Sequence, residues 1–205
     1  MSELVFYTNP QSRGRIVRWM LEEVGAPYAT EILEYGTTMK SPEYLAINPM
    51  GKVPAIRHGE TVVTECAAIC AYLADAFPEA GLAPPPAGRG AYYRWLFFAA
   101  GPLESAIVNA ALGFEVSEDK RMTVGYGTKD LALDAIETAI ADSPYVTGDA
   151  FSAADVYVGS QIAFGLQFGT VPERDSFAAY VARVTDREAY RRAVAIDDGV
   201  GEAGG

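Results

Sequence analysis

The first eighty residues show short apolar runs separated by turn residues, a pattern typical of β-strands. The runs that predict strands are residues 4–7, 28–33, 53–57 and 61–64. The last two lie either side of His58-Gly59-Glu60, which predicts a hairpin.

Two stretches in the same region have apolar residues at helical spacing. The first runs from Ile16 to Val24, with Ser12 as a plausible N-cap and Gly25 as a plausible end. The second runs from Cys66 to Phe77 and is ended by a proline. Strand, helix, strand at the start favours a parallel strand pair with a right-handed crossover. The sequence therefore predicts a small βαβ-ββα domain.

A proline- and glycine-rich stretch, GLAPPPAGRG, follows at residues 81–90 and reads as a semi-rigid linker. Beyond it the pattern is helical, with little strand signal. Helices are predicted at residues 92–112, 117–141, 153–168, 176–185 and 188–195. The acidic, glycine-rich tail from residue 197 to 205 is expected to be disordered. We therefore expect an α/β domain at residues 1–80 and an all-helical domain at residues 91–205.

Two local patterns in the helical part carry structural predictions. Gly101-Pro102 predicts a kink inside the first long helix. Ser152 and Asp155 have the spacing of a capping box, with Asp in the usual Glu/Gln position. The helix that follows is apolar nearly all round, so it is expected to be buried and Asp155 to be structural.

The charge and composition exclude several functional classes. The formal net charge of −11 argues against sequence-independent nucleic-acid binding and against an anionic membrane surface. No apolar run is long enough to span a membrane, and the N-terminus lacks the pattern of a signal peptide, so we expect a cytoplasmic protein. Two cysteines and one histidine do not supply a metal cage. There is no glycine-rich phosphate loop.

Pro54 stands at the start of a predicted strand, where a proline is poorly tolerated. A cis bond between Val53 and Pro54 would turn the backbone and leave the N–H and C=O of Val53 pointing into a cleft. A peptide-like ligand could then pair with them as an extra strand. The alternative is a sheet-edge proline with no functional role.

Four motifs in order along the chain resemble those of the cytosolic glutathione transferases, and the resemblance covers nearly all of residues 3–190. They are SRGRIVRWMLEEVGAPY at residues 12–28, NPMGKVPAI at 48–56, TECAAICAYL at 64–73 and GDAFSAADV at 148–156. The first is similar to the first helix of bacterial and fungal members of the serine type. The resemblance implies a thioredoxin-like domain followed by a helical bundle, and a homodimer.

The resemblance also implies which residues bind glutathione. Val53 and Pro54 would hold the backbone of its cysteine, and Glu65 would take the γ-glutamyl amine. The backbone N–H of Cys66 would bind the γ-glutamyl carboxylate. Here the sequence departs from the family, which usually has Ser or Thr at this position, and a thiol is a weak donor. Two cleft-bordering lysines suit the glycine carboxylate of glutathione, Lys40 and Lys52.

Two hydroxyls compete to activate the glutathione thiol. Ser12, at the start of the first helix, matches the serine-type members, which have a Ser-Arg pair. Tyr7, at the end of the first strand, matches the tyrosine-type members, in which an arginine such as Arg13 assists. We favour Ser12 because its flanking sequence is closer to the serine-type set. A helix N-cap and a core tyrosine are the structural alternatives.

The leading hypothesis is a transferase that activates glutathione as a thiolate for attack on a hydrophobic electrophile, with glutathione as co-substrate and no cofactor. An acceptor pocket would draw on the aromatic helix at residues 92–112, which also carries Asn109. A second hypothesis keeps the fold but makes the reaction a glutathione-dependent peroxide reduction, disulfide reduction or isomerisation. A third is a binding protein without catalysis.

Overall fold

The computed structural model describes residues 3–203, with side chains to Val200. The chain divides into two compact units. One runs to Leu82 and takes in the chain from Arg187 onward, and the other is Ala83–Asp186. The first is an α/β unit and the second is mostly helical, so the predicted fold class is confirmed.

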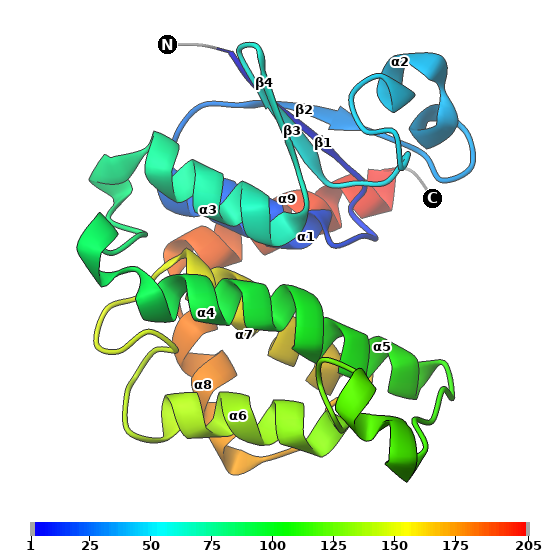
Figure 1. The fold of residues 1–205 in the computed structure, drawn as a ribbon. Helices are drawn as coiled ribbons and strands as arrows, with labels where there is room; N and C mark the ends of the chain where they lie inside the picture. Colours follow the sequence, from blue (N-terminus) through cyan, green and yellow to red (C-terminus); the bar gives the residue numbers. More distant parts are fainter. Residues whose placement is uncertain (1–2, 204–205) are drawn as a thin grey trace. The chain divides into compact units, whose positions relative to one another are not determined.

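The first unit is built on a four-stranded mixed sheet in the order β2-β1-β3-β4 (Figure 1). Its strands are β1 Leu4–Thr8, β2 Ala29–Ile32, β3 Ala55–His58 and β4 Thr61–Thr64. As predicted, β1 and β2 are parallel with a helix between them, and β3 and β4 form an antiparallel hairpin. The helices of this unit are α1 Gly14–Val24, α2 Pro42–Leu45, α3 Cys66–Ala76 and α9 Glu188–Ala203, with 3₁₀ turns η1 Thr38–Lys40 and η2 Pro78–Ala80.

The two faces of β1 have different partners. Phe6 faces the helical layer, where the Arg18 guanidinium of α1 lies 4.9 Å from its ring centre. Tyr7 points the other way, because successive strand residues alternate. It packs in a buried cluster with Tyr44 of α2 and Met39 of η1.

The bond between Val53 and Pro54 is cis, as the sequence suggested. The strand β3 begins only at Ala55, two residues later than predicted. The loop before it is fixed by the carbonyl of Lys52, which accepts a hydrogen bond from the Tyr44 hydroxyl at 2.6 Å. This hydrogen bond holds the loop before the cis-proline against α2.

The helix α9 corrects two expectations. It continues to Ala203, so the part of the tail up to that residue is helical and not disordered, while residues 204 and 205 lie outside the described chain. It also packs on α1 and groups with the first unit instead of the helical domain expected at 91–205. Ion pairs that the pattern did not reveal hold α9 to α1, and one of them is buried. Asp197, 1% exposed, lies 3.1 Å from the buried Arg18 of α1.

The second unit contains four of the five helices predicted after the linker, with two interruptions, and the fifth is α9. Its elements are η3 Pro86–Gly88, α4 Gly90–Phe98, the π-helical turn η4 Ala99–Leu103, α5 Glu104–Ala111, η5 Glu118–Thr123, α6 Lys129–Ala141, α7 Ala153–Gln167 and α8 Asp175–Thr185. Where a kink was predicted at Gly101-Pro102, the structure has the π-helical turn. The predicted helix at 117–141 is wrong in its first half, because Gly127 has φ +64° and interrupts it.

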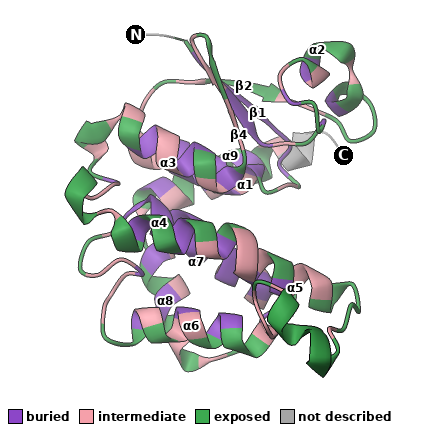
Figure 2. Cartoon of the chain, viewed as in Figure 1, coloured by how far each residue is buried: buried purple, intermediate pink, exposed green. Residues whose placement is uncertain are grey.

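The helix α7 is buried along nearly all of its length (Figure 2). Its capping box is confirmed: the Asp155 carboxylate accepts a 3.0 Å hydrogen bond from the Ser152 N–H. It also accepts from the Val146 N–H at 2.8 Å and from the Tyr180 hydroxyl at 2.9 Å. Burial raises the pKa of Asp155, and these donors oppose the shift. Among the described residues, no helix is both long and apolar enough to cross a membrane.

Candidate functional site

Ser12 lies in the turn that joins β1 to α1, and its side chain is half-buried. Its hydroxyl donates to the carbonyl of Asn9 at 2.6 Å and accepts from the Gly14 N–H at 2.9 Å. The Ser12 N–H also donates to the Asn9 carbonyl, at 3.0 Å. The N-cap position itself is Arg13, so the expected N-cap at Ser12 is off by one residue. The Ser12 oxygen nevertheless sits at the positive end of α1.

A second hydroxyl lies beside Ser12. Thr8 is fully buried, and its Oγ1 has no hydrogen-bond partner within residues 3–203. Gly14 separates the two side chains: a Cβ at this glycine would lie 1.9 Å from the Thr8 Oγ1 and 2.9 Å from the Ser12 Oγ. The glycine therefore lets the helix begin in direct contact with both hydroxyls.

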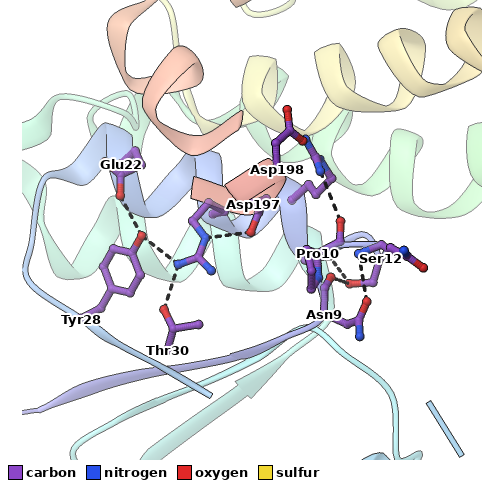
Figure 3. A network of polar contacts seen from close by, with 12 residues as sticks. Asn9, Pro10, Ser12, Glu22, Tyr28, Thr30, Asp197 and Asp198 are labelled. Atoms are coloured by element: carbon purple, nitrogen blue, oxygen red, sulfur yellow. Dashed lines mark hydrogen bonds and ion pairs between the residues drawn. The ribbon is translucent and has the colours of Figure 1, made fainter. Parts of the chain in front are cut away.

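Two arginines of α1 tie this turn to α9 (Figure 3). Arg15 donates to the carbonyl of Pro10 at 3.3 Å and pairs with Asp198 at 2.7 Å. One turn further along, Arg18 pairs with Asp197. The turn that carries Ser12 is thus held from both α1 and α9.

Tyr7, the other candidate hydroxyl, is 9% exposed and has a different environment. Its ring packs against Tyr44 with centroids 5.7 Å apart, and its hydroxyl accepts a long hydrogen bond from the Arg57 Nε at 3.4 Å. Because successive side chains of β1 point to opposite faces of the sheet, Thr8 faces the helical layer and Tyr7 faces away from it. The core role considered for Tyr7 is therefore the one its contacts favour.

The start of α3 has an unusual backbone. Glu65 precedes the helix with φ +66° and ψ +120°, the one positive φ at a residue other than glycine in the described chain. Its side chain is exposed. A glutamate in this region is strained by roughly 1–3 kcal/mol, and such strain concentrates at ligand-binding sites.

Cys66 brings α3 and the Ser12 turn together. It is 8% exposed, and its Sγ lies 3.7 Å from the Arg13 carbonyl, a weak hydrogen bond. Both cysteines are free thiols, and burial raises the pKa of Cys70 well above its ordinary value. This contact of the Cys66 thiol is with the backbone of the Ser12 turn.

The cis-proline turn lies next to Glu65. In the hairpin register Ala55 pairs with Thr64, so Pro54 and Glu65 are adjacent at the same end. Within residues 3–203, the N–H and C=O of Val53 take part in no hydrogen bond. The open backbone edge that the sequence suggested is therefore present beside the start of α3.

The two candidate lysines differ. The Lys40 ammonium donates to the carbonyls of Met50 and Gly51, at 3.1 and 2.9 Å, so it also fastens the loop before the cis bond. Lys52 is exposed, and its ammonium makes no hydrogen bond or ion pair within the described residues. Both remain on the loops that flank the Val53 edge.

The second unit contains a pocket of its own, with a volume of about 430 Å³. It is lined by Gly101, Pro102, Ser105, Asn109, Val124, Gly125 and Tyr126. The Asn109 amide donates to the Tyr126 hydroxyl at 3.0 Å. Among the aromatic residues of the helix predicted at residues 92–112, Trp95 is buried in the core and Phe97 is exposed. Tyr126 carried no signal in the sequence, because it lies in an irregular loop.

The four-stranded sheet, the cis-proline and the helix start beside it define the first unit as thioredoxin-like, and the second unit is helical. The family model described as "Glutathione S-transferase, N-terminal domain" matches residues 12–76. The maleylacetoacetate isomerase of Pseudomonas aeruginosa is 30% identical over 146 residues, which cover 67% of this chain and 68% of that protein. The chain belongs to the glutathione S-transferase family.

Two further similarities agree with this assignment. Glutathione S-transferase DHAR3, chloroplastic, of Arabidopsis thaliana is 29% identical over 83% of this chain, which spans 63% of that relative's length. The crystal structure of a glutathione transferase homolog from Sulfitobacter with bound glutathione superposes with a TM-score of 0.74. It is 27% identical and covers 98% of this chain and 99% of its own.

Proposed function

We propose that this protein is a glutathione transferase that binds glutathione between the Val53 edge and the start of α3. The observation that carries the proposal is Glu65, an exposed carboxylate held in a strained conformation beside an unpaired backbone edge. An exposed glutamate kept at such a position is available to bind a cationic group of a ligand. The γ-glutamyl amine of glutathione supplies one.

Each group of glutathione has a complementary feature nearby. The γ-glutamyl carboxylate suits the backbone N–H groups and positive dipole end of α3, beginning with the N–H of Cys66. The peptide N–H and C=O of the ligand's cysteine suit the unpaired groups of Val53, as in strand addition. The glycine carboxylate suits Lys52 and the remaining hydrogen of Lys40.

Ser12 is the hydroxyl we favour for stabilising the thiolate. A free thiol has a pKa near 8.5, and lowering it by two units takes about 2.7 kcal/mol of preferential stabilisation. A hydrogen bond to a charged group contributes about 1.5–3 kcal/mol, and the dipole of α1 adds about 0.3–1 kcal/mol. These two together are of the required size.

Breaking the hydrogen bond from the Ser12 hydroxyl to the Asn9 carbonyl requires little free energy. In the ligand-free protein the hydroxyl points at the Asn9 carbonyl. Turning it to the sulfur gives up one neutral hydrogen bond, worth about 0.5–1.5 kcal/mol. The Asn9 carbonyl keeps its bond from the Ser12 N–H, so no buried acceptor is left unpaired. Tyr7 stays the alternative, although its packing and its bond from Arg57 disfavour it.

The test has two parts. Calorimetric titration with reduced glutathione should show binding that Glu65→Ala weakens by at least tenfold, while Glu60→Ala, an exposed glutamate on the hairpin turn, leaves it unchanged. The ultraviolet thiolate band of the complex should be lost in Ser12→Ala and kept in Tyr7→Phe. No binding at millimolar glutathione refutes an enzyme of this kind. Loss of the band in Tyr7→Phe alone transfers the role to Tyr7.

Isomerisation is the second candidate reaction, because a relative at 30% identity is named maleylacetoacetate isomerase. It uses the same glutathione site. Turnover of maleylacetoacetate that exceeds conjugation of an aryl halide would favour it, and the reverse would favour the transferase. Faster reduction of a hydroperoxide or of hydroxyethyl disulfide would favour the reductive alternatives.

We also propose that the protein is a cytoplasmic homodimer, as its family resemblance suggests. Sedimentation equilibrium should then give twice the mass of the chain. A monomer at micromolar concentration would contradict the dimer without affecting the proposed chemistry.

A further inference from the structure

Thr8 poses a problem that the fold does not explain. Its side chain is 0% exposed, and its hydroxyl has no partner in the described chain. Buried polar groups are nearly always hydrogen-bonded, so an exception calls for a reason. Valine has the same shape, has a higher strand propensity and carries no hydroxyl to desolvate. Packing alone would therefore favour valine at this position of β1.

The position of Thr8 relative to Ser12 supplies a reason. Both hydroxyl oxygens lie within 3 Å of the same point, the place where Gly14 would carry a Cβ. The Ser12 oxygen uses its proton on Asn9 and accepts from the Gly14 N–H. A hydroxyl oxygen has two acceptor sites, so one acceptor site of Ser12 is still open. The Thr8 hydroxyl, which has no partner among the described residues, is a donor on the other side of that point.

We propose that Thr8 is a positioning residue for Ser12. In the ligand-free protein the two hydroxyls are not hydrogen-bonded to each other. When the Ser12 side chain turns to give its proton to the sulfur of glutathione instead of Asn9, its oxygen comes within reach of the Thr8 hydroxyl, which then donates to it. The oxygen then accepts from two donors, Thr8 and the Gly14 N–H. Two donors on an oxygen polarise its own O–H and strengthen the bond that it gives. They also hold the hydroxyl in the rotated position.

This inference rests on the proposed role of Ser12 and adds a residue that does not touch glutathione. It also explains Gly14. Any side chain there would collide with the Thr8 oxygen and push the two hydroxyls apart. The glycine thus serves the contact between the hydroxyls and not only the start of the helix.

The experiment compares Thr8→Val with Thr61→Val, a threonine of the exposed strand β4. We measure the thiolate band of the glutathione complex against pH, kcat and KM for an aryl halide, and the thermal midpoint. Thr8→Val should lower kcat and the thiolate fraction by about three- to tenfold, the worth of one hydrogen bond, with KM for glutathione unchanged. Its thermal midpoint should be unchanged or higher, because it removes an unpaired buried hydroxyl. Thr61→Val should alter neither kcat nor the thiolate band.

Two further substitutions at Thr8 and one double variant make the result decisive. Thr8→Ser should restore most of the activity because it restores the hydroxyl. Thr8→Ala should repeat the loss, which excludes a packing effect of valine as its cause. In the Ser12→Ala background, Thr8→Val should have no additional effect. A Thr8→Val protein with wild-type kcat and thiolate fraction, beside an impaired Ser12→Ala, overturns the role of Thr8 alone. An unimpaired Ser12→Ala overturns the proposed role of Ser12 as well.

Discussion

The capping carboxylate of α7 permits the sharpest prediction of stability. Asp155 is 0% exposed and accepts hydrogen bonds from the N–H groups of Val146 and Ser152 and from two hydroxyls. In Asp155→Ala the hydroxyls can reorient, but the two backbone donors cannot. Each buried donor left unpaired costs about 1–3 kcal/mol, so we expect the free energy of unfolding to fall by about 2–6 kcal/mol.

Thermal and urea unfolding, followed by circular dichroism, measure this loss. For a chain of this length it corresponds to a lower thermal midpoint by about 5–20 °C. Asp149→Ala is the matched control, because Asp149 lies in the same loop and is exposed; its effect should stay within about 0.5 kcal/mol. Tyr180→Phe removes a single donor and should fall between the two. If Asp155→Ala and Asp149→Ala have the same thermal midpoint, the Asp155 carboxylate does not stabilise the start of α7.

Three further predictions concern separate parts of the chain. A serine hydroxyl on α8 and a nearby guanidinium hold the pKa of Glu137 below its ordinary value, so its contribution to stability is present above about pH 4.5 and is lost as the pH falls through the lowered pKa. Thermal midpoints of Glu137→Gln should therefore lie below wild type at pH 7 and converge with it as the pH falls through the lowered pKa; a constant gap would contradict this. Asp197→Ala strands the buried charge of Arg18 and should cost about 3–5 kcal/mol in urea unfolding, while Asp198→Ala at the exposed pair should cost less than about 1 kcal/mol. Cys66→Ser adds a hydroxyl donor at the start of α3 and should tighten glutathione binding about two- to tenfold by calorimetry; weaker binding would mean that the thiol matters for packing.

Local chemistry accounts for the parts of the fold that the sequence predicted. Turn residues bounded the strands, and the helical spacing after Ser12 located α1 to within two residues. A cis bond at Pro54 was one of two alternatives that the sequence left open, and an irregularity at Pro102, predicted as a kink and found as a π-helical turn, follows from what a proline ring does to a helix. The capping box at Asp155 was visible because both of its members lie three residues apart.

Contacts between distant segments account for the parts that it did not predict. The sequence of the acidic tail does not indicate that Asp197 pairs with Arg18, since the two are 179 positions apart in the chain. The unpaired hydroxyl of Thr8 becomes apparent only when Gly14 brings the helix start beside it. The strained backbone of Glu65 likewise depends on the hairpin before it and the helix after it. Motifs identify the candidate residues, whereas contacts between segments distant in the sequence determine the surroundings of each residue.

The return of α9 to the first unit has a consequence for biosynthesis. The second unit is continuous in sequence, from Ala83 to Asp186, so a ribosome delivers all of it before the last helix of the first unit exists. Until Asp197 emerges, Arg18 has no carboxylate partner on which to close the first unit. Domains usually complete their folding in the order in which they are made. Here the unit that begins first finishes last, so a nascent chain halted near residue 186 should expose the α1 surface to chaperones.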